Sequence, residues 1–431
     1  MIYTVLLIGL GLRLISVNQS LWLDEATSAL VAKMSIGDMF TRFLPGDFHP
    51  PLYYLILKFW ASIFGNSEIS LRIPSVVFGV ATVYVTYLIA KKLFNQKIGL
   101  IASFFLATSG LAIYYSQEAR MYSLAALLIS CLVYMFLERK WLLFSLTLAL
   151  IGMTDYVSLF IVPVFLIVGW GNIKKVILSF IPLLTVFLFW SPIFIKQLSG
   201  GLSVQGSAWW GILGQPTLKN FLLVPIKFIL GRISLDNRWL YGVVVVLLFY
   251  LFGYLLWRAR MAGKLLWLWL VLPVGLEILV SLKIPMLSYF RFLFVLPALY
   301  ILVGKGIENS RKYRRFFLCL VMGVNLVTTI CYLLTPKFQR EDWRGAASAI
   351  GEDKIVFPAA TQKEALIYYG KGEQIINTSQ ISLRDKEIWL SRYVWEIFDS
   401  DDSAKKSVEA LGYNKTSEYN FNGVVFWKYG K

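Results

Sequence analysis

Histidine, cysteine and charged residues are all scarce in this chain of 431 residues. It contains one histidine and three cysteines, and only 16% of its residues are charged. A single histidine excludes the His-rich metal sites found in many enzymes. The cysteines lie within apolar runs, where a free cysteine behaves as a small hydrophobic residue. We therefore expect neither a disulfide framework nor a metal cluster from Cys131, Cys319 and Cys331.

The sequence motifs of several soluble enzyme classes are also missing. There is no Walker-type phosphate loop, which argues against nucleotide hydrolysis, and no G-x-S-x-G nucleophile elbow. The N-terminal apolar run lacks a basic n-region and a small-residue cleavage pattern, so we interpret it as a membrane helix and not as a cleaved signal peptide. The net charge of +17 does not indicate nucleic-acid binding, because the basic residues are divided among short loops instead of forming one face.

Hydrophobic sequence, in contrast, is abundant. Hydrophobic residues make up 58% of the chain and the mean hydropathy is +0.65, whereas in a soluble domain about half of the residues are apolar and about a quarter are charged. Apolar runs of about 20 residues recur, which is the length that crosses a bilayer as a helix. We therefore predict a polytopic α-helical membrane protein. The predicted spans lie near residues 1–17, 71–90, 98–115, 121–137, 141–154, 157–170, 176–195, 239–257, 265–282, 288–304 and 316–334.

The distribution of lysine and arginine sets the predicted topology. Residues 49–65, HPPLYYLILKFWASIFG, are apolar but short for a span, and they suit an interfacial helix. If they do not cross, every connector on one side carries at least two basic residues, as the positive-inside rule requires of cytoplasmic loops. We therefore predict eleven spans with the N-terminus in the cytoplasm and the C-terminus outside. The basic connectors are 91–97, 138–140, 172–175, 258–264 and 305–315.

The composition changes after Leu334, and residues 335–431 contain no further span. The stretches DKIVFPAA, KEIWLSRY and GVVFWKY predict strands, while EDWRGAASAIG and TQKEALIYYG predict helices that end at glycine. Such alternation indicates a small α/β domain on the outer face. We predict a transmembrane domain at 1–334, with an outer loop at 18–70, and an extracytoplasmic domain at 335–431.

On this topology, ionisable residues from distant parts of the chain gather on the outer face. Two adjacent acids stand in the sequence WLDE, directly after the first span. Arginine presents a planar fork that suits phosphate, and a carboxylate serves as a general base. A phosphate-bearing substrate at the membrane surface would use both. The residues are Asp24, Glu25, Asp47, His49, Arg72, Glu118, Arg120, Asp155 and Arg291.

Each of these residues also has a simpler interpretation. The two acids of WLDE suit the first turn of a helix, where the macrodipole favours negative charge, and arginines near span ends often anchor at lipid headgroups. His49 and Asp47 are typical of a loop and a turn. Tyr53, Tyr122 and Tyr289 fit an interfacial aromatic belt as well as a sugar or lipid groove. Arg13 lies inside the first span, and we expect it to pair with one of the outer carboxylates.

Five stretches, in order, resemble the membrane glycosyltransferases of the GT-C class. They are WLDEATSAL, HPPLYYLILKFW, LRIPSVVFGV, YYSQEARMYSL and YFRFLFVLPALYILVGKGI. The nearest group is the bacterial one similar to protein O-mannosyltransferases and to the lipid A aminoarabinose transferase, and the resemblance covers the whole membrane part.

The resemblance implies a glycosyltransferase that uses a polyprenyl-phosphate-linked sugar on the outer face of the cytoplasmic membrane. It implies that Asp24 and Glu25 are the catalytic motif, with Asp24 acting on the acceptor. QEARMY and YFR match places where basic residues meet the donor phosphate, so Arg120 and Arg291, with Arg72, are the predicted phosphate-binding residues. Relatives often carry a histidine where this chain has Asp155 in TDY, so a carried-over role for this turn is in doubt.

Asp47, His49, Tyr53, Glu118, Tyr122, Asp155 and Tyr289 are weaker candidates for substrate binding. No nucleotide leaves in this reaction, so a metal is not required, although Asp24, Glu25 and Asp155 have the ligand chemistry for a divalent ion. The partners implied are the lipid-linked donor, membrane lipids and a glycan, lipid or protein acceptor. A transporter or flippase for an anionic lipid-linked saccharide is the alternative, and a structural subunit of a cell-envelope complex is a third. The sequence names neither the sugar nor the acceptor.

Overall fold

The computed structural model describes residues 1–204, 210, 214–358, 361–382 and 385–431. The chain forms two compact units. One, the helical unit, contains Met1–Val17, Ser35–Ile56 and Arg72–Leu334; the other, the α/β unit, contains Asn18–Met34, Leu57–Leu71 and Thr335–Lys431. The predicted outer loop 18–70 therefore contributes to both units.

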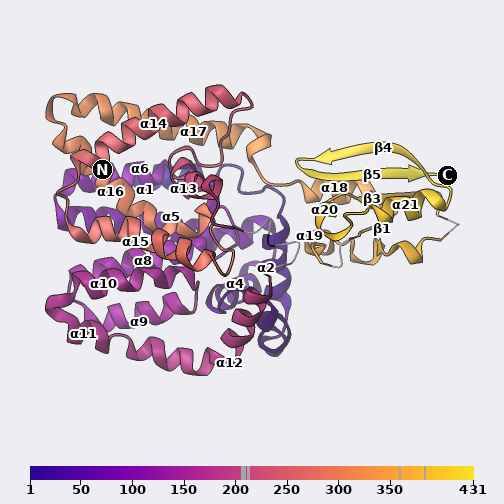
Figure 1. Ribbon diagram of the computed structural model, residues 1–431, viewed down its shortest axis with the longest axis horizontal. Coiled ribbons are helices and arrows are strands. Elements are labelled where there is room, and N and C mark those ends of the chain that lie inside the picture. The colour runs from indigo at the N-terminus through magenta and orange to yellow at the C-terminus, as the bar shows by residue number, and fades with distance from the viewer. Residues whose placement is uncertain (205–209, 211–213, 359–360, 383–384) are drawn as a thin grey trace. The chain divides into compact units, whose positions relative to one another are not determined.

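Most helices of the helical unit lie roughly parallel to one another (Figure 1). The pairs α6 and α16, α8 and α9, and α14 and α16 pack side by side. The α-helices are α1 (Ile2–Leu14), α3 (Ile36–Asp38), α4 (Leu52–Phe64), α5 (Glu68–Leu93), α6 (Gln96–Ala107), α7 (Gly110–Ser116), α8 (Tyr122–Leu137), α9 (Trp141–Gly152), α10 (Val162–Val168), α11 (Ile173–Leu178), α12 (Ile181–Ser203), α13 (Leu218–Leu230), α14 (Arg238–Arg258), α15 (Lys264–Ser281), α16 (Leu296–Asn309) and α17 (Arg314–Leu334). The short π- and 3₁₀-helices are η1 (Met39–Phe43), η2 (Leu44–Gly46), η3 (Val157–Ile161), η4 (Trp170–Asn172), η6 (Tyr289–Val295) and η7 (Arg311–Tyr313).

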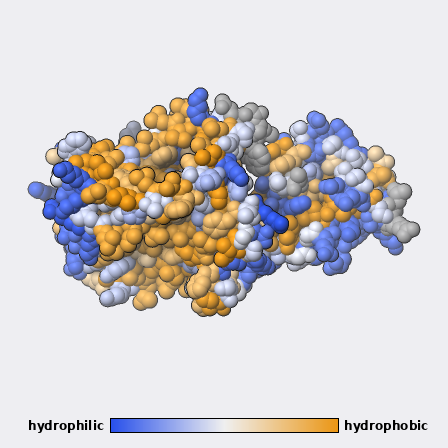
Figure 2. Space-filling view, turned by 90° about the horizontal axis from the view of Figure 1, so that it is seen from below, coloured by the Kyte–Doolittle hydropathy of each residue, from blue (hydrophilic) through white to orange (hydrophobic). Residues whose placement is uncertain are grey.

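The helical unit has the length and hydropathy of a polytopic membrane protein. Among the described residues, six helices are long and apolar enough to cross a membrane, or up to eight if each sharply bent pair is one span. Figure 2 shows a broad hydrophobic band over these helices, with hydrophilic side chains gathered at their end. The predicted spans at 1–17, 121–137 and 141–154 correspond to shorter apolar helices, α1, α8 and α9. The exact count of eleven and the orientation stay predictions.

The segment predicted to be interfacial forms α4, a helix of 13 residues. At about 1.5 Å per residue this helix is about 20 Å long, shorter than the hydrocarbon core, although α1, which is predicted to be a span, has the same number of residues. It begins after Pro50 and Pro51, which suit the start of a helix because proline lacks a backbone N–H.

Arg13 has a different role from the one predicted. No carboxylate pairs with it in the described chain: its Nε donates to Ser116 Oγ at 3.0 Å, and Nη1 donates to the carbonyl oxygens of Gly9 and Ala107 at 2.9 and 3.0 Å. The Ala107 carbonyl lies at the C-terminal end of α6, where the chain bends by 61° into α7. A cation suits this position because the last carbonyls of a helix lack intrahelical partners. The expectation of a carboxylate partner is therefore wrong.

The α/β unit is built on a five-stranded sheet in the order β2-β1-β3-β5-β4. β1 pairs in parallel with β2 and β3, and β5 pairs antiparallel with β3 and β4. The strands are β1 (Lys354–Val356), β2 (Ile375–Ile376), β3 (Glu387–Ser391), β4 (Asn414–Phe421) and β5 (Val424–Gly430). The helices are α2 (Leu23–Lys33), α18 (Trp343–Ile350), α19 (Glu364–Tyr368), α20 (Trp395–Phe398) and α21 (Ser403–Ala410), with the 3₁₀-helices η8 (Pro336–Phe338), η9 (Gly372–Gln374) and η10 (Thr378–Gln380).

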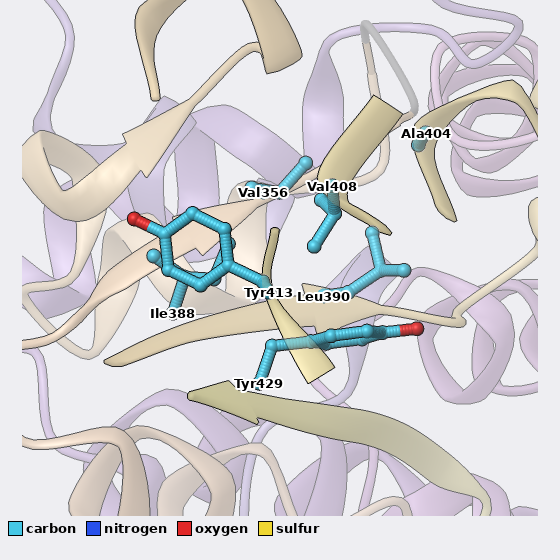
Figure 3. Close-up of a cluster of buried hydrophobic side chains, with 7 residues drawn as sticks. All are labelled: Val356, Ile388, Leu390, Ala404, Val408, Tyr413 and Tyr429. Atoms are coloured by element: carbon cyan, nitrogen blue, oxygen red, sulfur yellow. The ribbon is translucent and has the colours of Figure 1, made fainter. Parts of the chain in front are cut away.

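The core of this unit lies where the sheet meets α21 (Figure 3). Burial of apolar side chains stabilises it by roughly 25 cal/mol per Å² removed from water. The helix predicted to end at Gly351 does so: α18 stops at a residue with φ of +60°, a conformation that glycine adopts without steric cost. The buried side chains of the core are Val356, Ile388, Leu390, Ala404, Val408, Tyr413 and Tyr429.

Candidate functional site

The acidic pair of WLDE lies in the first turn of α2, within the α/β unit. Trp22, the residue before the helix, has an extended backbone, and Asp24 and Glu25 follow at once. Acidic side chains are favoured in a first helical turn because the free N–H groups there carry partial positive charge. Asp24 is half-buried, whereas the Glu25 side chain is completely buried. The two neighbours therefore face different surroundings.

Glu25 pairs with an arginine from the C-terminal part of the chain. Arg340 Nε lies 3.0 Å from Glu25 Oε2, and the two side chains are 1% and 0% exposed. A buried carboxylate needs such a partner, because removing an unpaired charge from water is costly. Glu25 is thus held in place by a buried ion pair next to Asp24.

A third acid and a tyrosine complete this polar cluster. Glu341 accepts hydrogen bonds from Trp343 Nε1 at 2.8 Å and from the Tyr393 hydroxyl at 3.1 Å. Burial raises the pKa of Tyr393, and the negative charges of Glu341 and Asp24 raise it further, so this hydroxyl remains protonated. We call Asp24, Glu25, Arg340, Glu341 and Tyr393 the acid cluster.

The sequence interpretation missed three members of the acid cluster. Arg340, Glu341 and Tyr393 belong to the C-terminal region, which was predicted as a separate domain. The signal that was available is the charged stretch QRED, which begins five residues after the end of the last predicted span.

The segment before α2 is fastened to the same unit by hydrogen bonds. The Tyr369 hydroxyl accepts from the Leu21 backbone N–H at 2.8 Å and donates to Glu68 at 3.1 Å. Arg344 donates to Glu68 at 3.2 Å and to the Asn18 carbonyl oxygen at 3.2 Å. These contacts fix the start of α2, and with it the acid cluster.

A second polar cluster lies in the helical unit and contains three predicted site residues. Asp47 lies 3.3 Å from His49 Nδ1 and accepts a 2.8 Å hydrogen bond from the Tyr54 hydroxyl. Arg120 donates to Tyr54 at 3.2 Å, and its Nη2 lies 3.4 Å from the same His49 nitrogen. When His49 Nδ1 carries a proton it donates to Asp47, and when it does not it accepts from Arg120. It cannot do both at once. We call these four residues the histidine cluster.

The histidine cluster keeps Asp47 ionised. Burial on its own would raise the pKa of Asp47, but His49, Arg120 and the Tyr54 hydroxyl outweigh it and lower the pKa to about 2. The turn PGDFHPP thus becomes a fixed charged element instead of a solvated loop.

Asp155 and Arg291, both predicted site residues, line one cavity of about 400 Å³ in the helical unit. Asp155 Oδ2 accepts hydrogen bonds from the Ser158 backbone N–H at 3.0 Å and its hydroxyl at 2.8 Å. The Arg291 guanidinium has no hydrogen-bond partner in the described part of the chain, and its Nε is buried. The rest of the lining is mainly apolar: Phe48, Tyr156, Val157, Leu159, Phe160, Phe187, Phe194, Gln197, Leu198, Gly201, Val204, Val280, Ile284, Pro285 and Met286.

Gln197 connects the cavity with the loop that carries the histidine cluster. Its amide nitrogen donates to the carbonyl oxygens of Leu44 and His49 at 2.7 and 3.3 Å, while its carbonyl oxygen accepts from Tyr156 at 2.5 Å. Burial, together with the charges of Asp47 and Asp155, raises the pKa of Tyr156 to about 12. The cavity wall and the histidine cluster are therefore neighbours. Gln197 belongs to α12. The stretch 196–238, which the predicted spans leave as an outer loop, includes residues 205–209 and 211–213, which lie outside the described residues.

The other predicted residues are buried in the helical unit away from the cavity lining. Arg72 is fully buried and donates to the Val17 carbonyl oxygen at 2.8 Å. The Tyr53 hydroxyl lies 3.0 Å from Ser75 Oγ, and Glu118 is 1% exposed. Tyr122 packs edge-on against Phe290.

Arg232, which donates a hydrogen bond to Tyr289, is a further cation that the sequence analysis did not identify. The Tyr289 hydroxyl accepts a 2.9 Å hydrogen bond from Arg232, whose guanidinium lies 4.8 Å from the ring centre of Tyr114. Burial lowers the pKa of Arg232, but Tyr114, Tyr289 and Tyr115 outweigh it and raise the pKa above its usual value. This arginine is committed to tyrosines, in contrast to Arg291.

A metal site is not evident in the described ranges. No group of three or more histidine, cysteine, aspartate or glutamate side chains comes together there in a way that would hold an ion. The acid cluster contains three carboxylates, and Arg340 already pairs with one of them.

Comparison with known proteins gives consistent results. Residues 48–195 match the family model of dolichyl-phosphate-mannose-protein mannosyltransferase. A search of curated protein sequences finds no match. Among solved structures, ArnT from Cupriavidus metallidurans bound to undecaprenyl phosphate is similar with a TM-score of 0.59 and 13% identity, over 99% of this chain and 97% of that one.

Two archaeal structures are also similar. The Archaeoglobus fulgidus oligosaccharyltransferase in complex with zinc and sulfate has a TM-score of 0.56 and 11% identity, over 99% of this chain and 72% of that one. The oligosaccharyltransferase AglB of the same organism, in complex with an inhibitory peptide and a dolichol-phosphate, has a TM-score of 0.54 and 11% identity, over 99% and 74%. The resemblance to the GT-C membrane glycosyltransferases is thus confirmed, by the fold of the whole chain and by the mannosyltransferase family match over residues 48–195.

Proposed function

We propose that this protein is a glycosyltransferase that moves a sugar from a polyprenyl-phosphate-linked donor to an acceptor on the outer face of the cytoplasmic membrane. Asp24 is the general base, and arginines bind the donor phosphate. The observation that carries the proposal is the apolar cavity with Arg291 in its wall and no partner for that guanidinium among the described residues. The solved structures of similar fold in complex with undecaprenyl phosphate and with a dolichol-phosphate agree with such a donor.

The cavity has the chemistry that a lipid phosphate requires. Its mainly apolar wall suits an isoprenoid chain, and a guanidinium in low-dielectric surroundings attracts a phosphate much more strongly than one in water. Among the predicted arginines, Arg291 is the best placed, because Arg120 belongs to the histidine cluster and Arg72 is fully buried on a backbone carbonyl. We assign Arg291 to binding of the donor phosphate. We assign Arg120 to holding the histidine cluster, which lies next to the cavity wall, in its shape.

The acid cluster has the chemistry that the acceptor requires. Asp24 is half-buried at a helix start, while the neighbouring Glu25 is neutralised by Arg340. Asp24 takes the proton of an acceptor hydroxyl or amine as the acceptor atom forms a bond to the anomeric carbon. The bond from that carbon to the phosphate oxygen breaks, and the electron pair leaves with the polyprenyl phosphate, whose added charge Arg291 stabilises.

An assay with purified protein separates this proposal from its alternatives. A radiolabelled polyprenyl-phosphate sugar is supplied to the protein in vesicles with candidate acceptors. Transfer of the label to an acceptor is the expected result. Uptake without transfer would identify a transporter or flippase, and neither activity would identify a structural subunit.

The outer-face location has its own test. Single cysteines at Ser67 and Ser403, both exposed, are introduced in a chain whose native cysteines are replaced. Both should react with a membrane-impermeant maleimide in intact cells, because loop 18–70 and residues 335–431 are predicted to lie outside. Labelling of neither would contradict the outer-face location, and labelling of one would contradict the topology.

A further inference from the structure

Glu277 is a buried acid of the helical unit that the proposed mechanism does not use. It lies on α15 and is 0% exposed, and neither carboxylate oxygen has a well-aligned hydrogen-bond partner within the described structure, although the backbone of Ser288 lies near enough to favour the charged form. Acids inside membrane helices are costly unless they are paired, and where they occur they commonly mark functional sites. Because an unpaired buried charge is so costly, the neutral protonated form suits this environment.

The position of Glu277 relates it to the proposed donor cavity. Val280, one helical turn further along α15, lines that cavity, and so does Ile284, which follows the end of the helix at Ser281. Arg291 and Asp155, which also line it, are the charged groups that act on Glu277 electrostatically. The hydroxyl of Ser281, one turn beyond Glu277, is likewise buried without a partner in the described chain.

The other charged side chains near this helix lie at its far end, are already bonded, or are exposed. Lys283 follows the last turn of α15 and is exposed, and Arg232 donates to Tyr289 of η6 at 2.9 Å. α15 packs against η3, α10, η6 and α16. On α16, Glu308 pairs with Lys97 at 3.1 Å and with Arg314 at 3.4 Å. Lys264 begins α15 and Lys305 lies in the last turns of α16, where its ammonium is 5.2 Å from the Phe94 ring centre. Arg291 and Asp155 therefore determine the local field.

The net charge at the cavity depends on whether Glu277 is protonated or ionised. Asp155 contributes one negative charge and Arg291 one positive charge, so a neutral Glu277 leaves the wall balanced. An ionised Glu277 would add a second negative charge and would compete with a phosphate for Arg291.

Resting on the proposed function, we propose that Glu277 tunes donor binding: the protonated side chain is the form that admits the phosphate of the lipid-linked donor, and ionisation of Glu277 weakens it. Phosphate binding and proton binding are then reciprocal, because each favours the state that the other requires. Glu277 is a positioning residue for charge and does not touch the reacting atoms.

The experiment measures the affinity of the purified full chain, in detergent, for a polyprenyl methyl phosphate. This probe is a diester, so its single charge stays constant over the range in which buried glutamates titrate, from about pH 6 to about pH 9. For the unmodified protein the affinity should fall by roughly tenfold for each pH unit above the titration of Glu277. Glu277→Gln, which mimics the protonated form in shape and charge, should retain the low-pH affinity throughout.

Two control variants separate the possible results. Asp155→Asn changes the affinity but should leave the pH dependence in place, because Glu277 is intact. Arg291→Ala should lower the affinity by roughly 30-fold or more at every pH. If Glu277→Gln and the unmodified protein show the same pH profile, Glu277 has only a structural role and the inference is wrong. Absence of binding by the unmodified protein at any pH would instead reject the proposed function on which it rests.

Discussion

The acid cluster and the proposed donor cavity, which Asp155 and Arg291 line, have opposite electrostatic properties. In the acid cluster of the α/β unit, carboxylates are abundant and are held by hydrogen bonds and by one buried arginine. In the cavity of the helical unit, the wall is mainly apolar, and Arg291 has no hydrogen-bond partner in the part of the chain that the structure describes. Hydrogen bonds and a paired cation stabilise the charged form of a carboxylate, whereas a cation without a hydrogen-bond partner is ready to bind an anion.

This difference assigns separate tasks to the two units. The acid cluster is expected to act on the acceptor, so damage to it should appear in turnover. The cavity is expected to hold the donor, so damage to it should appear in donor affinity. Measuring both quantities for each variant tests whether the tasks are separate.

Asp24→Asn should give the largest effect. The substitution retains the shape and hydrogen bonding of the side chain but removes the basic oxygen, and positioned proton transfer contributes about 10²–10⁴-fold to a rate. Turnover should fall by at least that order while donor affinity stays nearly unchanged. Glu25→Gln is the matched control and should cost less, because Glu25 is committed to Arg340. Near-normal turnover of Asp24→Asn would mean that the two acids of WLDE only stabilise the first turn of α2. The general base would then have to be sought at Asp47 or Asp155.

Arg340→Met should be the next most damaging change. Removing one partner of a buried ion pair typically costs about 3–5 kcal/mol, because the other charge is left uncompensated. Loss of stability should therefore be visible in thermal unfolding, together with lower turnover. The double variant Glu25→Gln with Arg340→Met should recover part of the stability, since the buried charge is gone. Additive effects of the two changes would show that the pair does not act as a unit.

Arg291→Ala should lower donor affinity more than turnover, in contrast to the changes in the acid cluster. Loss of a desolvated, charge-assisted contact typically costs about 2–5 kcal/mol, or roughly 30-fold or more in donor affinity. Turnover at saturating donor should fall less than affinity does. Arg42→Ala, at an exposed arginine paired with Asp38, is the matched control and should change neither quantity. Full donor use by Arg291→Ala at low donor concentration would make this arginine a headgroup anchor.

The sequence was sufficient to predict a helical membrane protein and several site neighbours. Positive-inside counting placed Asp47, His49 and Arg120 on one face, and the structure brings these three into one cluster. It likewise placed Asp155 and Arg291 together, and they line one cavity. Topology predicts which ends of spans are near one another, and polar residues at those ends can then meet.

Other features depend on contacts that no local pattern records. Arg340 and Glu25 lie far apart in the sequence, and only the folded α/β unit brings them together. Glu277 is a single acid in an apolar run. The hydropathy of the run still predicts a span and indicates nothing about the role of the acid. The predicted strands at 353–360, 386–393 and 423–429 are present as β1, β3 and β5, although residues 359–360 lie outside the described residues. β4 was missed because its sequence, NKTSEYNF, is mostly polar and exposed at the edge of the sheet.

The smallest expected effect concerns the stability of the histidine cluster in acid. Because the pKa of Asp47 is lowered from 3.8 to about 2, its ionised form stabilises the folded chain at any pH above 3.8. That contribution, about 2 kcal/mol, should be lost progressively as the pH falls from 3.8 towards 2. Thermal unfolding in detergent, measured from neutral to acid pH, should show this loss in the unmodified protein. Asp47→Asn should be less stable at neutral pH and should lack this part of the acid dependence. Asp38→Asn, at an exposed pair with Arg42, should behave like the unmodified protein, since exposed pairs contribute about 0–1 kcal/mol. An Asp47→Asn variant with the full acid dependence would show that the histidine cluster does not hold Asp47 ionised, and the turn PGDFHPP would then be an ordinary loop.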